Sequence, residues 1–394
     1  MPLPNGAGPW LLSAMAPFRS VTCGFLLLST ALLHGAEEAF TPLFNGRDLT
    51  GWVNVNCAPE TFTPRDGMIH CDGIPTGALR TDRQYENFIL ELEWRHLKSG
   101  GNAGVFIWSG PLPAVGQPFL RAIEVQVLDH GYGKSDWFTT HGDIFPIHGS
   151  QMKPFSPSKG DRSFPKEFRS KGTNEWNHYR IVATNGVIRL SVNGAEVSGG
   201  TDCNWRKGYI ALESEGGTVD WRNLRIREFP STGATEAQSA PPAEPWDSLY
   251  DGRSLRGWRT NPGTEKVWKN SDWTVRGTAN ASPDAILWSD AKPAVSDLFL
   301  DWKWSAKPGL RLPPVALQSV GSSETIALPA LEKASPDGWN RLELRRTPQG
   351  FDLILNRTPA GSIAVPQGPV RLGLKPSDVE VSIASPFARR LGAR

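Results

Sequence analysis

The sequence predicts an all-β protein built from two tandem antiparallel β-sandwich domains. Three observations support this: short apolar segments alternate in the period of a half-buried strand, turn-forming residues separate them, and long amphipathic helical patterns are absent. The 394 residues include 40 glycines and 33 prolines, which favours many turns between short strands. Asn-Gly and Asp-Gly pairs at 45–46, 66–67, 185–186 and 193–194 mark the turns expected within each sandwich.

An internal repeat divides the chain. Residues 43–52 (LFNGRDLTGW) and 249–258 (LYDGRSLRGW) are identical at six of ten positions, including both glycines and the tryptophan. Three further pairs follow in the same order, namely 88–94 with 298–304, 175–186 with 338–350, and 208–226 with 368–385. Residues 230–245 are rich in Pro, Ala, Ser and Thr and lack hydrophobic periodicity, as expected of a linker. We therefore predict a first domain over 40–229 and a diverged second copy over 246–389.

The N-terminus predicts export. Arg19 precedes an apolar run over 21–33 that is too short to span a bilayer as a helix, so residues 1–36 are expected to form a signal peptide cleaved near Ala36. No later segment has the length and hydrophobicity of a transmembrane helix. The mature protein is therefore expected in the periplasm or the medium.

Three cysteines would follow the leader, which is an odd number for an oxidising compartment. A bridge between Cys57 and Cys71 could close a hairpin, and a bridge from either of them to Cys203 is equally allowed. One thiol is expected to stay unpaired.

Composition excludes some partners. The formal net charge is +2, with 39% hydrophobic and 21% charged residues, so neither nucleic acid nor a strongly anionic membrane is an expected partner. The 16 tryptophans against 5 tyrosines suit stacking on sugar rings, although aromatic core packing explains most of them.

The segment AIEVQVLDHG (122–131) predicts a strand with one polar face. Strict alternation places Ile123, Val125 and Val127 on one side, and Glu124 and Gln126 on the other, the side of Leu128 and His130. A Glu and a Gln two residues apart form a hydrogen-bonding platform for a hydroxyl-rich ligand. A solvated sheet face is the equally good alternative.

The segment YIALESEG (209–216) places Glu213 and Glu215 on one strand face. Like charges there repel unless they are solvated, paired with cations or bridged by a metal. The second copy has Gly373 and Lys375 at the matching positions. Because a structural role should have been kept in both copies, this loss favours a functional role in the first.

The excess length of the first copy lies in a block over about 109–171 that is dense in Gly, Pro, His, Asp and aromatic residues. Its segment HGDIFPIHGSQMKP offers His141, Asp143 and His148. They could hold a divalent cation, although the spacing matches no standard zinc site, and an acid–base or structural role for one histidine is favoured. In GGNAGVFIW (100–108), Asn102 could contact a ligand, or the glycines could only permit a close backbone approach.

Together, LFNGRDLTGW, GGNAGVF, EVQVLD, EWNHYRI and GYIALESEG…WRNLRI resemble the 3-keto-disaccharide hydrolase domain family, also called domain of unknown function 1080. The resemblance spans about residues 40–229. It implies a concanavalin-like (lectin/glucanase) jelly-roll sandwich that binds carbohydrate on its concave sheet. It also implies cleavage of 3-keto-glycosides, in which a base removes the acidified C2 proton, the enolate expels the group at C1, and water adds back.

From these segments we predict a carbohydrate-cleaving site in the first copy and none in the second. The expected catalytic residues are His141, Glu213 and Glu124, and the expected substrate contacts are Gln126, Asn102, Asp143, Glu215, Trp108 and His148. The chain departs from the family pattern, because Glu213 and Glu215 replace an expected Gln and His, and Trp108 replaces an Arg. These departures favour the alternative of a non-catalytic glycan-binding protein; an interaction scaffold is a third possibility.

Overall fold

A computed structural model describes residues 39–133, 135–290, 295–305 and 312–390. The expected signal peptide lies outside these residues. Within them regular structure is nearly all β, and the predicted all-β fold of two sandwiches is confirmed. No helix in the described part of the chain is long and apolar enough to cross a membrane. The described helical elements are η1 (His130–Tyr132), η2 (Glu236–Gln238) and α1 (Pro262–Val267).

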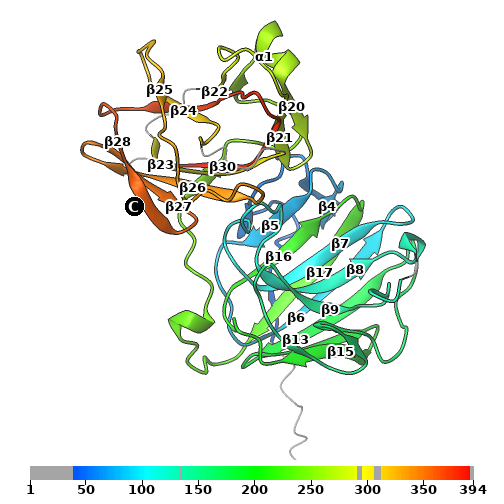
Figure 1. The fold of residues 1–394 in the computed structure, drawn as a ribbon. Coiled ribbons are helices and arrows are strands. Elements are labelled where there is room, and N and C mark those ends of the chain that lie inside the picture. Colours follow the sequence, from blue (N-terminus) through cyan, green and yellow to red (C-terminus); the bar gives the residue numbers. More distant parts are fainter. Residues whose placement is uncertain (1–38, 134, 291–294, 306–311, 391–394) are drawn as a thin grey trace, which may run out of the picture. The chain divides into compact units, whose positions relative to one another are not determined.

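The first domain consists of two antiparallel sheets, which Figure 1 shows as two layers. The β6 sheet contains, in spatial order among the described residues, β10 (Lys153–Pro154), β15 (Ala195–Thr201), β14 (Val187–Val192), β13 (Asn177–Thr184), β6 (Phe88–His96), β17 (Val219–Glu228), β4 (Met68–Cys71) and β3 (Phe62–Arg65), with β1 (Thr41–Pro42) also paired to β17. The β8 sheet contains β11 (Ser158–Lys159), β12 (Arg162–Ser163), β9 (Ile144–Ile147), β8 (Ala122–Leu128), β7 (Asn102–Ser109), β16 (Tyr209–Ser214), β5 (Gly77–Thr81) and β2 (Trp52–Asn54).

The second domain has two further antiparallel sheets. The β23 sheet contains β20 (Trp268–Ser271), β21 (Thr274–Gly277), β30 (Val381–Arg390), β23 (Val295–Trp304), β26 (Asn340–Thr347), β27 (Gly350–Leu355) and β28 (Thr358–Ala364), with β18 (Trp246–Ser248) paired to β30. The β24 sheet contains β19 (Trp258–Arg259), β22 (Leu287–Ser289), β29 (Val370–Leu374), β24 (Val315–Ser319) and β25 (Ile326–Ala327). Both sheets follow the strand order of the corresponding sheets in the first domain, so each strand of the second domain has a counterpart in the first.

Alternation along the strands builds the core of the first domain. In β8, Ile123, Val125 and Val127 belong to a buried apolar cluster that also contains Tyr179 and Ile181 of β13. Burying such side chains between two sheets contributes roughly 1.5–3 kcal/mol each. The same alternation sends the other side chains of β8 to the outer face of the β8 sheet, as predicted.

Turn chemistry fixes the register of the hairpins. Asn185 and Gly186, which join β13 to β14, both have positive φ (49° and 75°), and Asn193 and Gly194, which join β14 to β15, do as well (47° and 92°). Two successive positive φ values are the signature of a type I′ hairpin turn, and Asn-Gly adopts them at the lowest steric cost. The turns predicted at these two pairs are confirmed.

Two features differ from the simplest expectation. The segment predicted as a linker is hydrogen bonded to the first domain, since Gln84 donates to the carbonyls of Ala240 and Pro241 and Lys207 pairs with Ser239. The described cysteines, Cys57, Cys71 and Cys203, are all buried free thiols, so none of the three bridges considered from the sequence is present. Burial raises the pKa of each thiol.

Candidate functional site

Polar side chains converge on the outer face of the β8 sheet, where β8, β7 and β16 lie side by side. β8 supplies Glu124 and Gln126, β7 begins with Asn102, and β16 supplies Glu213, followed by Glu215. Asn102 and Glu215 pair across the two strands, and the Asn102 amide donates a short hydrogen bond to the Glu215 carboxylate. Residues more than 90 positions apart in the sequence therefore form one cluster.

Gly104 makes room for two of these carboxyl groups. A Cβ at this position would lie 2.8 Å from Glu213 Oε2 and 3.1 Å from Glu124 Oε1, so these two oxygens are less than 6 Å apart across the bare backbone of β7. Glu124 is 6% exposed and Glu213 is 1% exposed. The sequence analysis allowed that the glycines of 100–108 permit a close approach, but it did not indicate that two acids from other strands lie over Gly104.

Burial controls the protonation of the three glutamates. It raises the pKa of Glu124 to about 8, with a further rise from Glu215 that Arg162 partly offsets. Burial, and then the charges of Glu124 and Glu215, raise the pKa of Glu213 well above its usual range, and Glu213 Oε2 has no hydrogen-bond partner. Burial also raises the pKa of Glu215 to about 7, against the opposing hydrogen bond from Asn102. At neutral pH, Glu124 and Glu213 therefore stay protonated, whereas Glu215 is close to its pKa and can exchange its proton.

Arg162, which the sequence reasoning missed, connects the cluster to a buried acid. Its guanidinium lies 3.0 Å from the Asp143 carboxylate and 3.4 Å from Gln126 Oε1. Gln126 Nε2 in turn donates to Asn102 Oδ1 (2.8 Å). Because both ends of the Gln126 amide are engaged, this residue positions Asn102 rather than presenting free groups to a ligand.

Asp143 is fully buried and accepts hydrogen bonds from the backbone N–H and the hydroxyl of Thr139 as well as from Arg162. It therefore holds the 139–143 loop and Arg162 in place. Nothing in the local sequence identifies Arg162, because β12 is a two-residue strand inside an aperiodic block.

Three predicted site residues lie elsewhere. Trp108 is 1% exposed in the apolar core, and its indole N–H donates to the Glu86 carbonyl, so the prediction that it contacts substrate is wrong. His148 stacks on Phe119, with ring centroids 6.0 Å apart. His141 lines a separate cavity that none of the three glutamates lines. The structure thus brings together Asn102, Glu124, Gln126, Asp143, Glu213 and Glu215.

No group of three or more His, Cys, Asp or Glu side chains among the described residues is arranged to hold a metal ion. His141, Asp143 and His148 do not face a common point. Asp143 pairs with Arg162, while His141 stacks on Phe168 and His148 stacks on Phe119. The divalent cation considered from the sequence therefore finds no ligand set in this part of the chain.

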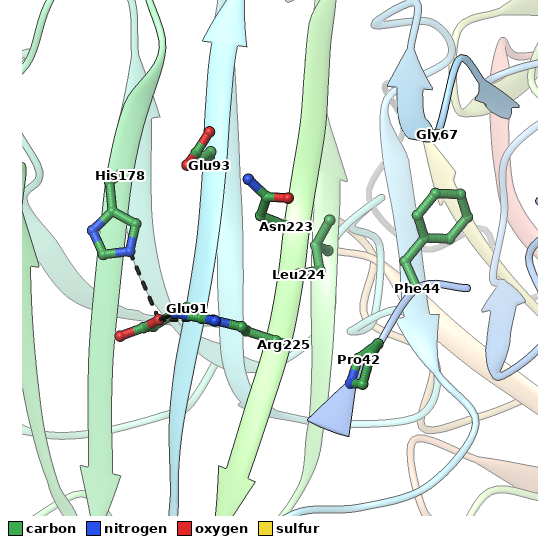
Figure 2. A pocket seen from close by; sticks show the side chains of 9 residues that line it. All are labelled: Pro42, Phe44, Gly67, Glu91, Glu93, His178, Asn223, Leu224 and Arg225. Atoms are coloured by element: carbon green, nitrogen blue, oxygen red, sulfur yellow. Dashed lines mark hydrogen bonds and ion pairs between the residues drawn. The ribbon is translucent and has the colours of Figure 1, made fainter. Parts of the chain in front are cut away.

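A polar pocket on the outer face of the β6 sheet is the competing candidate (Figure 2). There Glu91 accepts from Arg225 (2.6 Å) and Arg180, and His178 lies 4.0 Å away. Burial raises the pKa of Glu91, but the hydrogen bonds from the two arginines outweigh it and leave the pKa below its usual value. A permanently ionised, neutralised carboxylate stabilises a sheet face and has no proton to exchange at neutral pH, so this pocket is structural.

Among the described residues of the second domain, the positions that match Glu124, Glu213 and Glu215 carry no carboxyl group. Strand order and register place Ala316 where the first domain has Gly104, and Gly373 where it has Glu213. A Cβ on Gly373 would lie 2.7 Å from the ring of Trp288, which fills the space that the acids occupy in the first domain.

Residues 39–227 match the model of a family described as the 3-keto-alpha-glucoside-1,2-lyase-like domain. The family predicted from the sequence is confirmed for the first domain, and the match does not extend to the second. No curated protein matches the chain.

Several solved structures are similar to part of this chain. A Parabacteroides distasonis protein described as a candidate glycosyl hydrolase is 20% identical and covers 49% of this chain and 95% of its own, with a TM-score of 0.36. A carbohydrate binding module from Bacillus subtilis is 12% identical over 45% of this chain and 96% of its own (TM-score 0.34). A Bacillus subtilis protein with a galectin-like fold is 10% identical over 48% and 94% (TM-score 0.36).

Proposed function

We propose that the first domain, as the part of the chain that matches the 3-keto-alpha-glucoside-1,2-lyase-like family, cleaves 3-keto-glycosides in an exported, carbohydrate-active protein. The observation that carries this proposal is the cluster of Glu124, Glu213 and Glu215. Elimination from a 3-keto sugar needs one base and one or more proton donors close together. In this cluster burial raises the pKa of the three glutamates to different extents, so that one of them can act as the base and the others as proton donors.

In the proposed reaction, the base removes the C2 proton, whose acidity the C3 ketone has increased. The electron pair moves onto the C3 oxygen as an enolate and then forms the C1–C2 double bond as the C1–O bond breaks. The leaving oxygen takes a proton from an acid. Water then adds at C1 and a proton returns to C2, so that the sum is hydrolysis of the glycoside.

We assign the base to Glu215, because its pKa of about 7 lets it be ionised near neutrality and the Asn102 amide fixes one carboxylate oxygen. Glu215 and Asn102 are also partly exposed, whereas Glu124 and Glu213 are buried, so a ligand reaches Glu215 first. We assign hydrogen-bond donation to the C3 oxygen and the leaving group to protonated Glu213 and Glu124.

Non-catalytic glycan binding is the second candidate function. It is favoured by the departures from the family pattern, namely Glu213 and Glu215 in place of Gln and His, and by the near-complete burial of Glu124 and Glu213. We propose that the second domain, in which Trp288 fills the corresponding space, is ancillary in either case.

The deciding experiment incubates the purified protein with an aryl 3-keto-glucoside and with the matching plain glucoside. The proposal expects aglycone release from the keto sugar alone, with a loss of at least a hundredfold in Glu215→Gln. Glu175→Gln, which changes an exposed glutamate outside the cluster, is the matched control. Saturable binding of unmodified glycans without turnover of the keto sugar would instead establish the second candidate.

A further inference from the structure

One buried carboxylate near the glutamate cluster is not used by the mechanism proposed above. Asp129 directly follows β8 and is 2% exposed. It lies against the turn over 99–101, which leads into Asn102 at the start of β7. Because a buried charge is costly unless hydrogen bonds stabilise it, the partners of Asp129 show which parts of the chain it holds.

Three donors fix the Asp129 carboxylate. Its Oδ1 accepts from the backbone N–H groups of Gly100 and Gly131, both at 2.8 Å, and its Oδ2 accepts from the Thr173 hydroxyl at 2.9 Å. The backbone N–H of Asp129 donates to the Gly101 carbonyl (3.0 Å). Burial raises the pKa of Asp129, but the three hydrogen bonds to its carboxylate outweigh it and leave the pKa below its usual value. Asp129 is therefore an ionised anchor at neutral pH.

The same turn is enclosed by His96 and Gly217. A Cβ on Gly101 would overlap Nδ1 of the buried His96, and a Cβ on Gly217 would overlap the carbonyl oxygen of Asn102. The N–H of Gly217 donates to that carbonyl (3.1 Å). Burial lowers the pKa of His96, so its ring is neutral beside Asp129 at neutral pH. The close backbone approach considered from the sequence for this glycine-rich segment is therefore present.

Fixing this turn fixes the amide of Asn102. Gly100 and Gly101 directly precede Asn102, so their hydrogen bonds to Asp129 set the place at which β7 begins. Gln126 donates to Asn102 Oδ1 (2.8 Å), which leaves Asn102 Nδ2 to donate to the Glu215 carboxylate. Hydrogen bonds weaken steeply as their geometry departs from the ideal, so a displaced turn would weaken this contact.

We propose that Asp129 is a positioning residue, which clamps the turn over 99–101 so that Asn102 holds the carboxylate of Glu215. Asp129 touches neither Glu215 nor the substrate in this role and acts only through Asn102. That the clamp thereby keeps the catalytic base in place rests on the proposed function, whereas its effect on Glu215 does not depend on that function.

Two variants separate the clamp from the charge. In Asp129→Asn a side-chain oxygen can still accept from Gly100 and Gly131, but the negative charge is lost. In Asp129→Ser the hydroxyl can still cap the short helix η1 by accepting from Gly131, because serine is a strong N-cap residue. The serine oxygen lies one bond closer to the backbone, so it does not hold Gly100 as well. Both variants therefore keep the cap of η1, and only Asp129→Ser releases the turn.

Titration of Glu215 is measured first, by carbon-13 NMR of the full-length protein labelled at its glutamate carboxyl carbons. The Glu215 signal is assigned by its loss in Glu215→Gln. The hydrogen bond from Asn102 opposes the rise that burial causes in the pKa of Glu215. The titration midpoint should therefore move up by about one pH unit in Asn102→Ala, by about half to one unit in Asp129→Ser, and by less in Asp129→Asn. Every variant leaves Glu124, Glu213 and Asp272, the ionisable groups coupled to Glu215, unchanged.

A double variant tests the route of the effect. Asp129→Ser should add nothing to the shift in the Asn102→Ala background, because its effect passes through Asn102. Asp48→Ser, which removes an exposed aspartate that accepts from the Thr50 N–H in another turn, is the matched control and should titrate as the wild type does. An unchanged midpoint in Asp129→Ser, a downward shift in either Asp129 variant, or a further shift in the double variant would overturn the clamp. If Asp129→Ser does not fold, the sign of the shift in Asp129→Asn decides alone.

Turnover of an aryl 3-keto-glucoside is measured separately. The acidic limb of kcat/KM should move up with the NMR midpoint, so that Asp129→Ser loses roughly three- to tenfold at pH 6 and about twofold or less at pH 8. An equal loss at every pH would indicate general damage to the site and would overturn the positioning role. If no keto sugar is turned over, the proposed function fails, while the titration still decides whether Asp129 positions Asn102 on Glu215.

Discussion

Replacing Gly104 by alanine tests whether the close approach of two carboxyl groups is the basis of the activity. The added Cβ would lie 2.8 Å from Glu213 Oε2 and 3.1 Å from Glu124 Oε1, while ordinary contacts begin near 3.4 Å. The Glu213 oxygen must therefore move by about 0.6 Å and the Glu124 oxygen by about 0.3 Å. Misplacement of a reacting group by about 1 Å costs on the order of a hundredfold, so about half that displacement predicts roughly a tenfold loss of kcat/KM.

The fold should survive this substitution. Overpacking costs about 1–3 kcal/mol, and the better strand propensity of alanine offsets about 0.5–1 kcal/mol of it. For a domain of this size we expect the Tm to fall by less than about 10 °C. The assay is aglycone release from an aryl 3-keto-glucoside, with Tm measured on the same samples.

Gly110→Ala is the matched control. Gly110 directly follows the same strand, and a Cβ there meets nothing closer than a Trp205 ring carbon at 3.6 Å. Wild-type kcat/KM in Gly104→Ala would refute the reasoning, because the pair of acids would then tolerate displacement. An equal loss in Gly110→Ala would show that the assay reports general damage to the strand.

Three further predictions address charge and thiols. First, kcat/KM should decline below about pH 7, as Glu215 is protonated, and above about pH 8, as Glu124 ionises; a profile flat from pH 6 to 9 would contradict these roles. Second, the folded protein holds the Glu124 proton from its usual pKa of 4.5 up to about 8 while the unfolded chain releases it near 4.5, so folding stability falls as pH rises across that window. Glu124→Gln should therefore raise the Tm relative to wild type at pH 9 and not at pH 4, and a pH-independent difference would be inconsistent with the raised pKa. Third, Cys57 and Cys71 should react with a thiol reagent only after denaturation, because burial keeps both protonated and shielded; rapid labelling of the native protein would disprove this.

Local pattern was sufficient to predict the strands, their faces and two hairpin turns. Alternation in 122–128 placed Glu124 and Gln126 opposite the core, and the structure agrees, because side-chain direction in a strand is a local property. The Asn-Gly pairs were equally informative, since positive φ at two successive positions selects them.

The assembly of the site could not be predicted in the same way. β8 and β16 lie on either side of β7, yet about 80 residues of sequence separate them, and strand order depends on the whole chain. Arg162 lies in a two-residue strand within an aperiodic block, so no alternation of apolar and polar residues predicts which way its side chain points. Histidine composition directed part of the prediction to His141, which lines a separate cavity, whereas the predicted Glu124 and Glu213 do lie together. The burial that raises the pKa of these two glutamates is a tertiary property and could not be predicted from the local sequence. Trp108 was misplaced because a strand-end position was judged from its counterpart in the family and not from the core around it.

The position of the Trp288 ring beside Gly373 in the second domain limits which substitutions this site can accept. With Gly373 pressed against that ring and Ala316 in place of the bare backbone of Gly104, no single substitution could rebuild the carboxyl pair: an acid at 373 would collide with the indole, and removing the indole first would leave a void. Each step toward such a pair is unfavourable on its own, so single substitutions do not lead the second domain to it. The first domain is then the only described part of this chain in which selection on the carboxyl cluster can still act, and natural sequences should vary freely at position 316 but not at position 104.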